Sequence, residues 1–276
     1  MLKKILLTLD GSENAEKALP WAKQFAAREH AQVVLLRVVE ATRDRGAWGR
    51  GRDEARDYLL RMEKEFNYAG IPTKVLVRRG NAAREIVDTA KDQGCDLIVI
   101  STRGGSKVKR WVMGGVTEQV MRLSSVPVLP VWSHLNRPRQ GHVRRLIVPL
   151  DGSKRAESVV WWSVRLARLL HAKIVFLHVY PNGSERPRGW NSKVFEHLSR
   201  RMSVFSESLR GQGVRAEFKL QRGDAADRIL NFADCNDLIL TTTHGYGGVK
   251  RWILGSVAEK LVHAAAIPVL VYKSSA

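Results

Sequence analysis

The chain has 276 residues, which is enough for two domains of about 140 residues that each bury a core of their own. Hydrophobic residues make up 44% of the chain, which lies near the globular norm and excludes disorder as the default. The 46 Lys and Arg residues against 27 Asp and Glu residues give a formal net charge of +19, which favours polyanionic partners: nucleotide phosphates, nucleic acid or anionic lipid surfaces. An equally open interpretation is that the charge serves solubility alone.

The composition also predicts a cytoplasmic protein. No run of about 18 apolar residues occurs, so no membrane span is expected. The apolar run near the N-terminus is too short for a signal peptide before Asp10 interrupts it. The two cysteines, Cys95 and Cys235, each just precede a predicted fourth strand, and both are expected to be buried, reduced thiols. No CxxC pair and no grouping of Cys with His suggests a metal site.

In chain order, short apolar segments alternate with segments of helical periodicity. The first apolar run, residues 4–9, shows no polar alternation and suits a strand that is buried on both faces. It stops at Asp10-Gly11-Ser12, where Asp10 or Ser12 can cap a helix whose apolar positions recur as far as Ala26. A β-branched, apolar segment at 32–39 predicts the second strand.

The next stretch is the least regular part of this half. Residues 41–51 carry glycine and arginine without periodicity, so we predict a mobile loop there. A charged helix is predicted at 53–69, and Gly70-Ile71-Pro72 ends it. Its buried stripe is expected to consist of Tyr58, Leu59, Met62 and Phe66.

The remaining elements complete a parallel sheet. They are a strand at 73–78, a helix at 82–93, a strand at 96–101, a helical region at 114–123 and a strand at 126–131. The prolines of the fifth strand remove hydrogen-bond donors, so this strand should lie at a sheet edge. Strands that alternate with helices imply crossover connections and a parallel sheet.

The second half of the chain repeats the first. Adding 141 to the residue number carries Asp10-Gly11-Ser12 onto Asp151-Gly152-Ser153. The strands predicted for this half lie at 145–150, 172–179, 214–220, 237–241 and 267–272. A fixed period of this size indicates two whole domains of one fold. We place the domains at 1–133 and 144–276, with a linker at 134–143.

A glycine loop follows the fourth strand of each half. In the second half, Thr242-Thr243-His244-Gly245 is followed by nine residues and then Gly255-Ser256. In the first half, Ser101-Thr102-Arg103-Gly104 is followed by nine residues and then Gly114-Gly115. A strand, a glycine loop and a helix N-terminus make an anion site, because unpaired backbone N–H groups point at the ligand there.

The aspartates after the first strands predict the other side of the same site. If the first and fourth strands are neighbours, Asp10 or Asp151 and the glycine loop line one crevice at the carboxyl ends of the strands. The loop can then hold phosphates, and the aspartate can hold a sugar or a base. The alternative for each aspartate is a helix cap.

The sequence resembles the universal stress protein family over nearly its whole length, as two tandem domains. The resemblance rests on Leu-Asp-Gly-Ser after the first strand and His178-Val179 at the end of the second, on Thr243-His244-Gly245, on the segment Gly255 to Glu259, and on the segment Ile267 to Val271. It implies an α/β fold in which each domain is a doubly wound, five-stranded parallel sheet in the order 3-2-1-4-5 with helices on both faces.

ATP-binding members of that family carry Gly-x2-Gly-x9-Gly-Ser/Thr, with an Asp after the first strand and a Val after the second; other members lack the motif and hold no ATP. The resemblance therefore implies ATP or a related adenine nucleotide as the ligand, with Mg²⁺ as a candidate companion ion. The implied nucleotide-binding residues are Pro149, Asp151, Val179, Thr242, Thr243, His244, Gly245, Gly255, Ser256 and Val257 in the second half, and Asp10, Val38, Gly104, Gly114 and Gly115 in the first.

Both halves depart from the motif. Thr242 and Ser101 replace its first glycine, Gly115 stands where Ser or Thr is expected, and Thr8 stands where the other half has Pro149. A missing hydroxyl at Gly115 removes one phosphate donor, so we rank the second site above the first. No paired carboxylates and no Ser-His-Asp set recur in both halves, so slow ATP hydrolysis is the most that we expect.

Two alternatives to a nucleotide-binding stress protein stay open. One is a non-nucleotide scaffold whose two domains pair through their fifth strands and that serves as an interaction module; the other is a polyanion-binding protein. Whether the tandem chain also forms a homodimer is left open by the sequence. The cations of Lys109-Arg110-Trp111 and Lys250-Arg251-Trp252 either neutralise phosphates or are solvated, and their tryptophans are expected to pack on the sheet or on a domain interface. Trp161 and Trp162 are expected in the core or at an interface.

Overall fold

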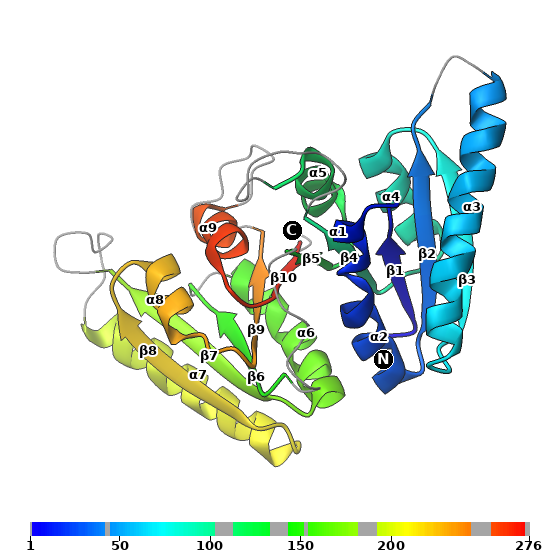
Figure 1. Ribbon diagram of the computed structural model, residues 1–276. Coiled ribbons are helices and arrows are strands. Elements are labelled where there is room, and N and C mark those ends of the chain that lie inside the picture. The colour runs from blue at the N-terminus through cyan, green and yellow to red at the C-terminus, as the bar shows by residue number, and fades with distance from the viewer. Residues whose placement is uncertain are drawn as a thin grey trace. The chain divides into compact units, whose positions relative to one another are not determined.

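The computed structural model describes residues 2–41, 45–102, 113–132, 143–151, 154–181, 192–243 and 255–273. The chain divides into two compact units, Met1–Gly141 and His142–Ala276 (Figure 1). All but the last residue of the predicted linker lies outside the described residues, as do both Lys-Arg-Trp segments.

Each described unit contains five strands interleaved with helices. The first unit has β1 Lys4–Thr8, α1 Glu13–Glu16, α2 Leu19–Glu29, β2 Gln32–Val39, α3 Arg45–Asn67, β3 Thr73–Arg79, α4 Ala82–Asp92, β4 Leu97–Ser101, α5 Gly115–Leu123 and β5 Val128–Val131. The second has β6 Arg145–Pro149, α6 Lys154–Leu170, β7 Lys173–Tyr180, α7 Ser192–Gly211, β8 Ala216–Arg222, α8 Ala225–Phe232, β9 Asp237–Thr242, α9 Ser256–Ala264 and β10 Val269–Tyr272.

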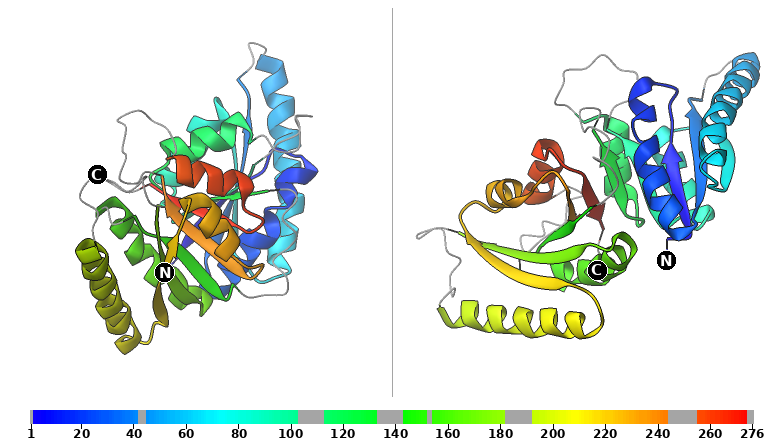
Figure 2. Two further views of the ribbon diagram at one scale, coloured as in Figure 1. Left: turned by 90° about the vertical axis from the view of Figure 1, so that its left-hand side faces the viewer. Right: turned by 60° about the horizontal axis from the view of Figure 1, so that its bottom comes forward.

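The strand order confirms the predicted fold. The first unit has the order β3-β2-β1-β4-β5 and the second has β8-β7-β6-β9-β10, and the strands within each unit pair in parallel. The central strands are apolar and buried, as in Ile5, Leu6 and Leu7 of β1, which are fully buried. Figure 2 shows, in the second unit, α6 and α7 on one face of the sheet and α8 and α9 on the other.

The predicted loop at 41–51 is wrong from Arg45 onward, where α3 begins. Helical order in this glycine-rich segment comes from tertiary contacts rather than propensity. The Arg79 guanidinium lies over the Trp48 ring, 5.6 Å from the ring centre. Gly51 packs against β2 so closely that a Cβ there would lie 3.3 Å from the Val39 side chain. Further along α3, three members of the predicted stripe are buried, and Met62 is half-buried.

The cysteine prediction holds for one residue and fails for the other. Cys95 is buried, and this burial raises the pKa of its thiol to about 11. Cys235 is exposed, because the chain turns there before β9 begins and the Cys235 amide donates to the Asp234 carboxylate at 2.6 Å. Of the two places expected for Trp161, the core and an interface, the structure excludes the core, because this residue is 60% exposed on α6.

Candidate functional site

The first and fourth strands are neighbours in both units, and in the first unit they pair as far as the carboxyl end of β1. β1 pairs with β4 from Ile5↔Leu97 to Thr8↔Ile100, and β6 pairs with β9 from Arg145↔Asp237 to Ile147↔Ile239. The strand order changes direction at this point, which is where open parallel sheets bind ligands. The pairing therefore brings the loop after the first strand beside the start of the glycine loop, as the sequence predicted.

The aspartate loop of the first unit is held by its own hydrogen bonds. The Asp10 carboxylate accepts from the Ser12 amide at 3.0 Å and from the Ser12 hydroxyl at 2.6 Å. Ser12 in turn caps α1 by accepting from the Ala15 amide at 3.2 Å. Ser12 is thus the cap, and Asp10, which is exposed, orients the turn in front of it.

The glycine loop returns to the strand end that it leaves. The Gly255 amide donates to the Thr243 carbonyl at 2.7 Å, and the Gly114 amide donates to the Thr102 carbonyl at 2.8 Å. Each glycine is the N-cap of a nine-residue helix, α9 or α5. Within the described part of the chain, no side chain caps α5 or α9. The first backbone N–H groups of both helices therefore lie at the crevice edge without a side-chain acceptor.

The close return leaves little room for a side chain at Gly114 in the first unit. A Cβ at Gly114 would lie 3.1 Å from the Thr102 carbonyl oxygen, which is tighter than ordinary packing. Gly115, the next residue, has open space around its Cβ position. In the second unit the residue after the glycine cap is Ser256, which is exposed at the start of α9.

The structure positions most of the predicted nucleotide-binding residues at these strand ends and helix starts. The ones it describes are Pro149, Asp151, Val179, Thr242, Thr243, Gly255, Ser256, Val257, Asp10, Val38, Gly114 and Gly115. Asp151 is exposed and Thr243 is buried. The other predicted residues, His244, Gly245 and Gly104, lie outside the described residues.

The residue before the predicted valine differs between the units. His178 is 3% exposed, and its Nδ1 lies 2.7 Å from the Leu150 carbonyl oxygen. Burial lowers the pKa of His178. Its counterpart Arg37 instead reaches over the turn after β1, where a Cβ at Gly11 would lie 3.0 Å from Nη1 of Arg37.

Sequence reasoning missed the group that Arg37 joins. Its guanidinium lies 5.2 Å from the centre of the Tyr58 ring. Burial and the Glu16 carboxylate raise the pKa of the Tyr58 phenol. The contacts join β2 to α3, and only the helical periodicity of Tyr58 signalled them in the sequence.

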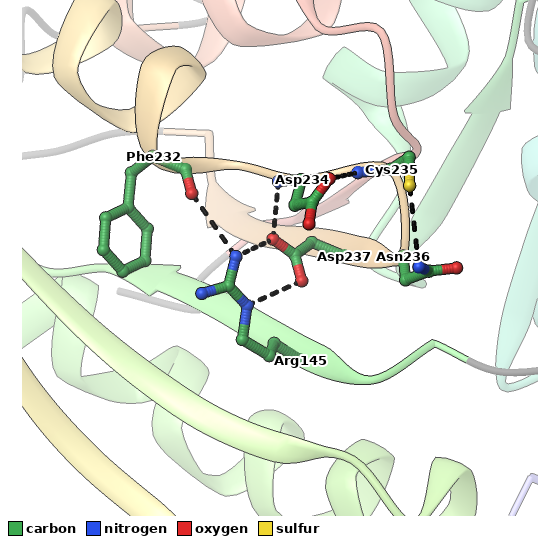
Figure 3. A network of polar contacts seen from close by, with 6 residues as sticks. All are labelled: Arg145, Phe232, Asp234, Cys235, Asn236 and Asp237. Carbon is green, nitrogen blue, oxygen red and sulfur yellow. Dashed lines mark hydrogen bonds and ion pairs between the residues drawn. The ribbon is translucent and has the colours of Figure 1, made fainter.

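A second polar network lies at the opposite ends of the strands (Figure 3). Arg145 at the start of β6 donates to both carboxylate oxygens of Asp237, at 2.8 and 2.6 Å, and the Asp234 amide donates to the same carboxylate at 2.7 Å. Asp237 is 2% exposed, and its hydrogen bond raises the pKa of Arg145. Because it lies at the amino ends of β6 and β9, this network stabilises the sheet and is not part of the crevice.

The described residues include no cluster of three or more His, Cys, Asp and Glu side chains that could hold a metal ion. None of the helices in the described ranges combines the length and the apolar character that a bilayer crossing requires. Among the described residues, the crevice edge presents the N-termini of α5 and α9, the Ser256 hydroxyl and the carboxylates of Asp10 and Asp151. Such groups suit a phosphorylated, hydroxyl-bearing ligand.

The sequence model of the Universal stress protein family matches residues 1–131 and, a second time, residues 142–273. The chain belongs to the universal stress protein family. Its two matches fit the two compact units that the structure shows, so this is a tandem universal stress protein.

Known universal stress proteins match either the whole chain or one domain. A universal stress protein of Mycolicibacterium smegmatis is 24% identical over 98% of this chain and 96% of its own length. Universal stress protein MJ0577 of Methanocaldococcus jannaschii is 30% identical over 48% of this chain and 95% of its own length. The crystal structure of a universal stress protein from Archaeoglobus fulgidus superposes with a TM-score of 0.80 at 23% identity, covering 99% of this chain and 98% of that one.

Proposed function

We propose that this tandem universal stress protein is a cytoplasmic stress-response protein that binds ATP or a related adenine nucleotide as a ligand. The nucleotide lies in the crevice between the ends of β6 and β9, with its phosphates toward the N-terminus of α9. Asp151 and the end of β7 near Val179 contact the sugar and the base. The first domain binds nucleotide more weakly.

The observation that carries the proposal is the start of α9. Gly255 hydrogen-bonds back to the strand end at Thr243, which fixes a helix N-terminus without a side-chain cap at the crevice. Such a terminus carries partial positive charge and unpaired donors, and both favour a phosphate. The net charge of +19 adds a long-range attraction for the same anion.

The second domain is favoured because of one hydroxyl group. Ser256 supplies a side-chain donor at the first position of α9, whereas Gly115 supplies none at the first position of α5. A hydrogen bond to a charged phosphate contributes about 1.5–3 kcal/mol, so one missing donor is enough to separate the two sites by more than tenfold.

The first prediction follows from the contacts proposed for the phosphates. Titration calorimetry of the full chain with Mg²⁺ present should show that ATP binds at least tenfold more tightly than adenosine, because adenosine makes no contact with the α9 N-terminus. Equal affinities for the two ligands would contradict a phosphate site. A sample that is denatured by heat and analysed by mass spectrometry should also release any nucleotide that copurifies.

A further inference from the structure

An aromatic and cationic cluster on α6 stands apart from the crevice chemistry. We call it the α6 cluster: Trp161, Trp162, Arg165 and Tyr272. The Arg165 guanidinium lies 4.5 Å from the Trp161 ring centre and 5.1 Å from the Trp162 ring centre. The two indoles pack edge to face with their ring centres 5.8 Å apart, and the ring centres of Trp162 and Tyr272 of β10 are 6.0 Å apart.

Trp161 is the exposed member of the cluster, and Trp162, Arg165 and Tyr272 are half-buried. Trp161 is 60% exposed, although an indole is among the most favourable side chains to bury. The equivalent positions on α2 in the first unit are Pro20, Trp21 and Gln24, and Trp21 there is 3% exposed. The same fold therefore needs neither an exposed indole nor an arginine at this place.

The charge around the cluster indicates the sign of its partner. α6 contains four basic residues and one acidic residue, and Arg168, one turn beyond Arg165, is exposed. The whole chain carries +19, so two copies repel each other, and an anionic partner is favoured. An anion alone would not require an exposed indole.

We propose that the α6 cluster binds single-stranded nucleic acid. An unpaired base stacks on the exposed face of Trp161, and the neighbouring phosphates lie near Arg165 and Arg168. Stacking on aromatic side chains combined with a basic surface is how single strands are bound without sequence preference. This site lies on α6 and does not depend on nucleotide binding between β6 and β9.

The test uses the full chain and a fluorescein-labelled 20-nucleotide oligo(dT), with binding followed by fluorescence anisotropy at low salt. Trp161→Ala should weaken binding by about fivefold or more, the effect of losing one stacked base. Trp161→Phe, which keeps an aromatic face, should retain most of the affinity. Tyr68→Ala is the matched control, because Tyr68 is 92% exposed in the other unit, and it should change nothing.

Two further arms separate stacking from charge. Arg165→Gln, which installs the residue found at the equivalent position Gln24, should reduce the slope of log affinity against log salt by about 0.7. The affinity for inorganic polyphosphate, obtained from competition with the labelled oligonucleotide, should be the same for wild type and Trp161→Ala. The proposal is overturned if wild type does not bind the oligonucleotide, or if Trp161→Ala and Tyr68→Ala behave alike. It is also overturned if Trp161→Ala weakens the binding of polyphosphate or of anionic phosphatidylserine vesicles as much as that of oligo(dT).

Discussion

Arg37 and His178 occupy equivalent positions at the ends of β2 and β7, and they meet different surroundings. Arg37 remains near the surface, where it covers the turn at Gly11 and the ring of Tyr58. His178 is buried, and its Nδ1 lies near the Leu150 carbonyl, which belongs to the turn that leads to Asp151. The buried imidazole thus supports the loop beside the proposed site in the second domain only.

The pKa of His178 gives a pH-dependent prediction. Burial lowers its pKa in the folded state, so the unfolded chain takes up a proton at a higher pH than the folded chain does. Stability from this residue is therefore complete above the unfolded pKa of about 6.5 and is lost as the pH falls below it. Urea unfolding of the wild type should show a lower midpoint at pH 5 than at pH 7.

The control for this prediction is a variant that cannot titrate. His178→Asn should show a smaller loss of stability between pH 7 and pH 5 than the wild type, even if it is less stable at pH 7. His171→Asn should keep the wild-type pH dependence, because His171 is exposed and its φ of 52° is one that Asn adopts readily. An unchanged pH dependence in His178→Asn would mean that this imidazole does not couple protonation to folding.

At the scale of elements, the starts of α5 and α9 differ by one residue within an otherwise similar arrangement. Both helices begin after a glycine that hydrogen-bonds to the end of the neighbouring strand. They differ at the next position, where α5 has Gly115 and α9 has Ser256. The space around the Cβ position of Gly115 is open, so a side chain fits there without rearrangement.

The Gly115→Ser substitution should therefore strengthen the first site. It adds the hydroxyl donor that α9 has, and calorimetry should show tighter ATP binding at a second site per chain. Gly115→Ala is the matched control, since it fills the same space and raises helix propensity but adds no donor. Identical ATP titrations for the Ser and Ala variants would show that the hydroxyl does not contact the ligand.

Several elements were predictable because their physics is local. The strand at 32–39 was confirmed to the residue. The pattern repeated in both halves placed the glycines at 114 and 255 where a loop enters a helix, and these glycines are the N-caps of α5 and α9. The first turns of α3 were missed because they depend on contacts with β2 and β3, such as that between Trp48 and Arg79. The exposure of Cys235 was missed because a turn held by a neighbouring carboxylate leaves no apolar signal.

At the scale of the whole molecule, tandem duplication supplies two copies of one site with different residues. The fold is the same in each unit, from the strand order to the hydrogen bond that closes the glycine loop. Side chains at the crevice differ between the units: Pro149 against Thr8, His178 against Arg37 and Ser256 against Gly115. Duplication of this kind lets one domain bind a ligand while the other diverges, and each domain provides the control for the other.

The measurement that tests the account most directly is the ATP affinity of Gly255→Val compared with that of Gly114→Val. Both variants place a branched Cβ at the N-cap of a helix whose amides should face the phosphates, and circular dichroism must first show that each is folded. We expect Gly255→Val to remove the tighter ATP site and leave only the weaker first-domain site, and Gly114→Val to leave most of the ATP binding intact. Asp151→Ala should lower ATP affinity by about 1 kcal/mol or more, and Asp10→Ala by less. Loss of binding in Gly114→Val with full binding in Gly255→Val would contradict a dominant second-domain site, and full binding in both would contradict the nucleotide site itself.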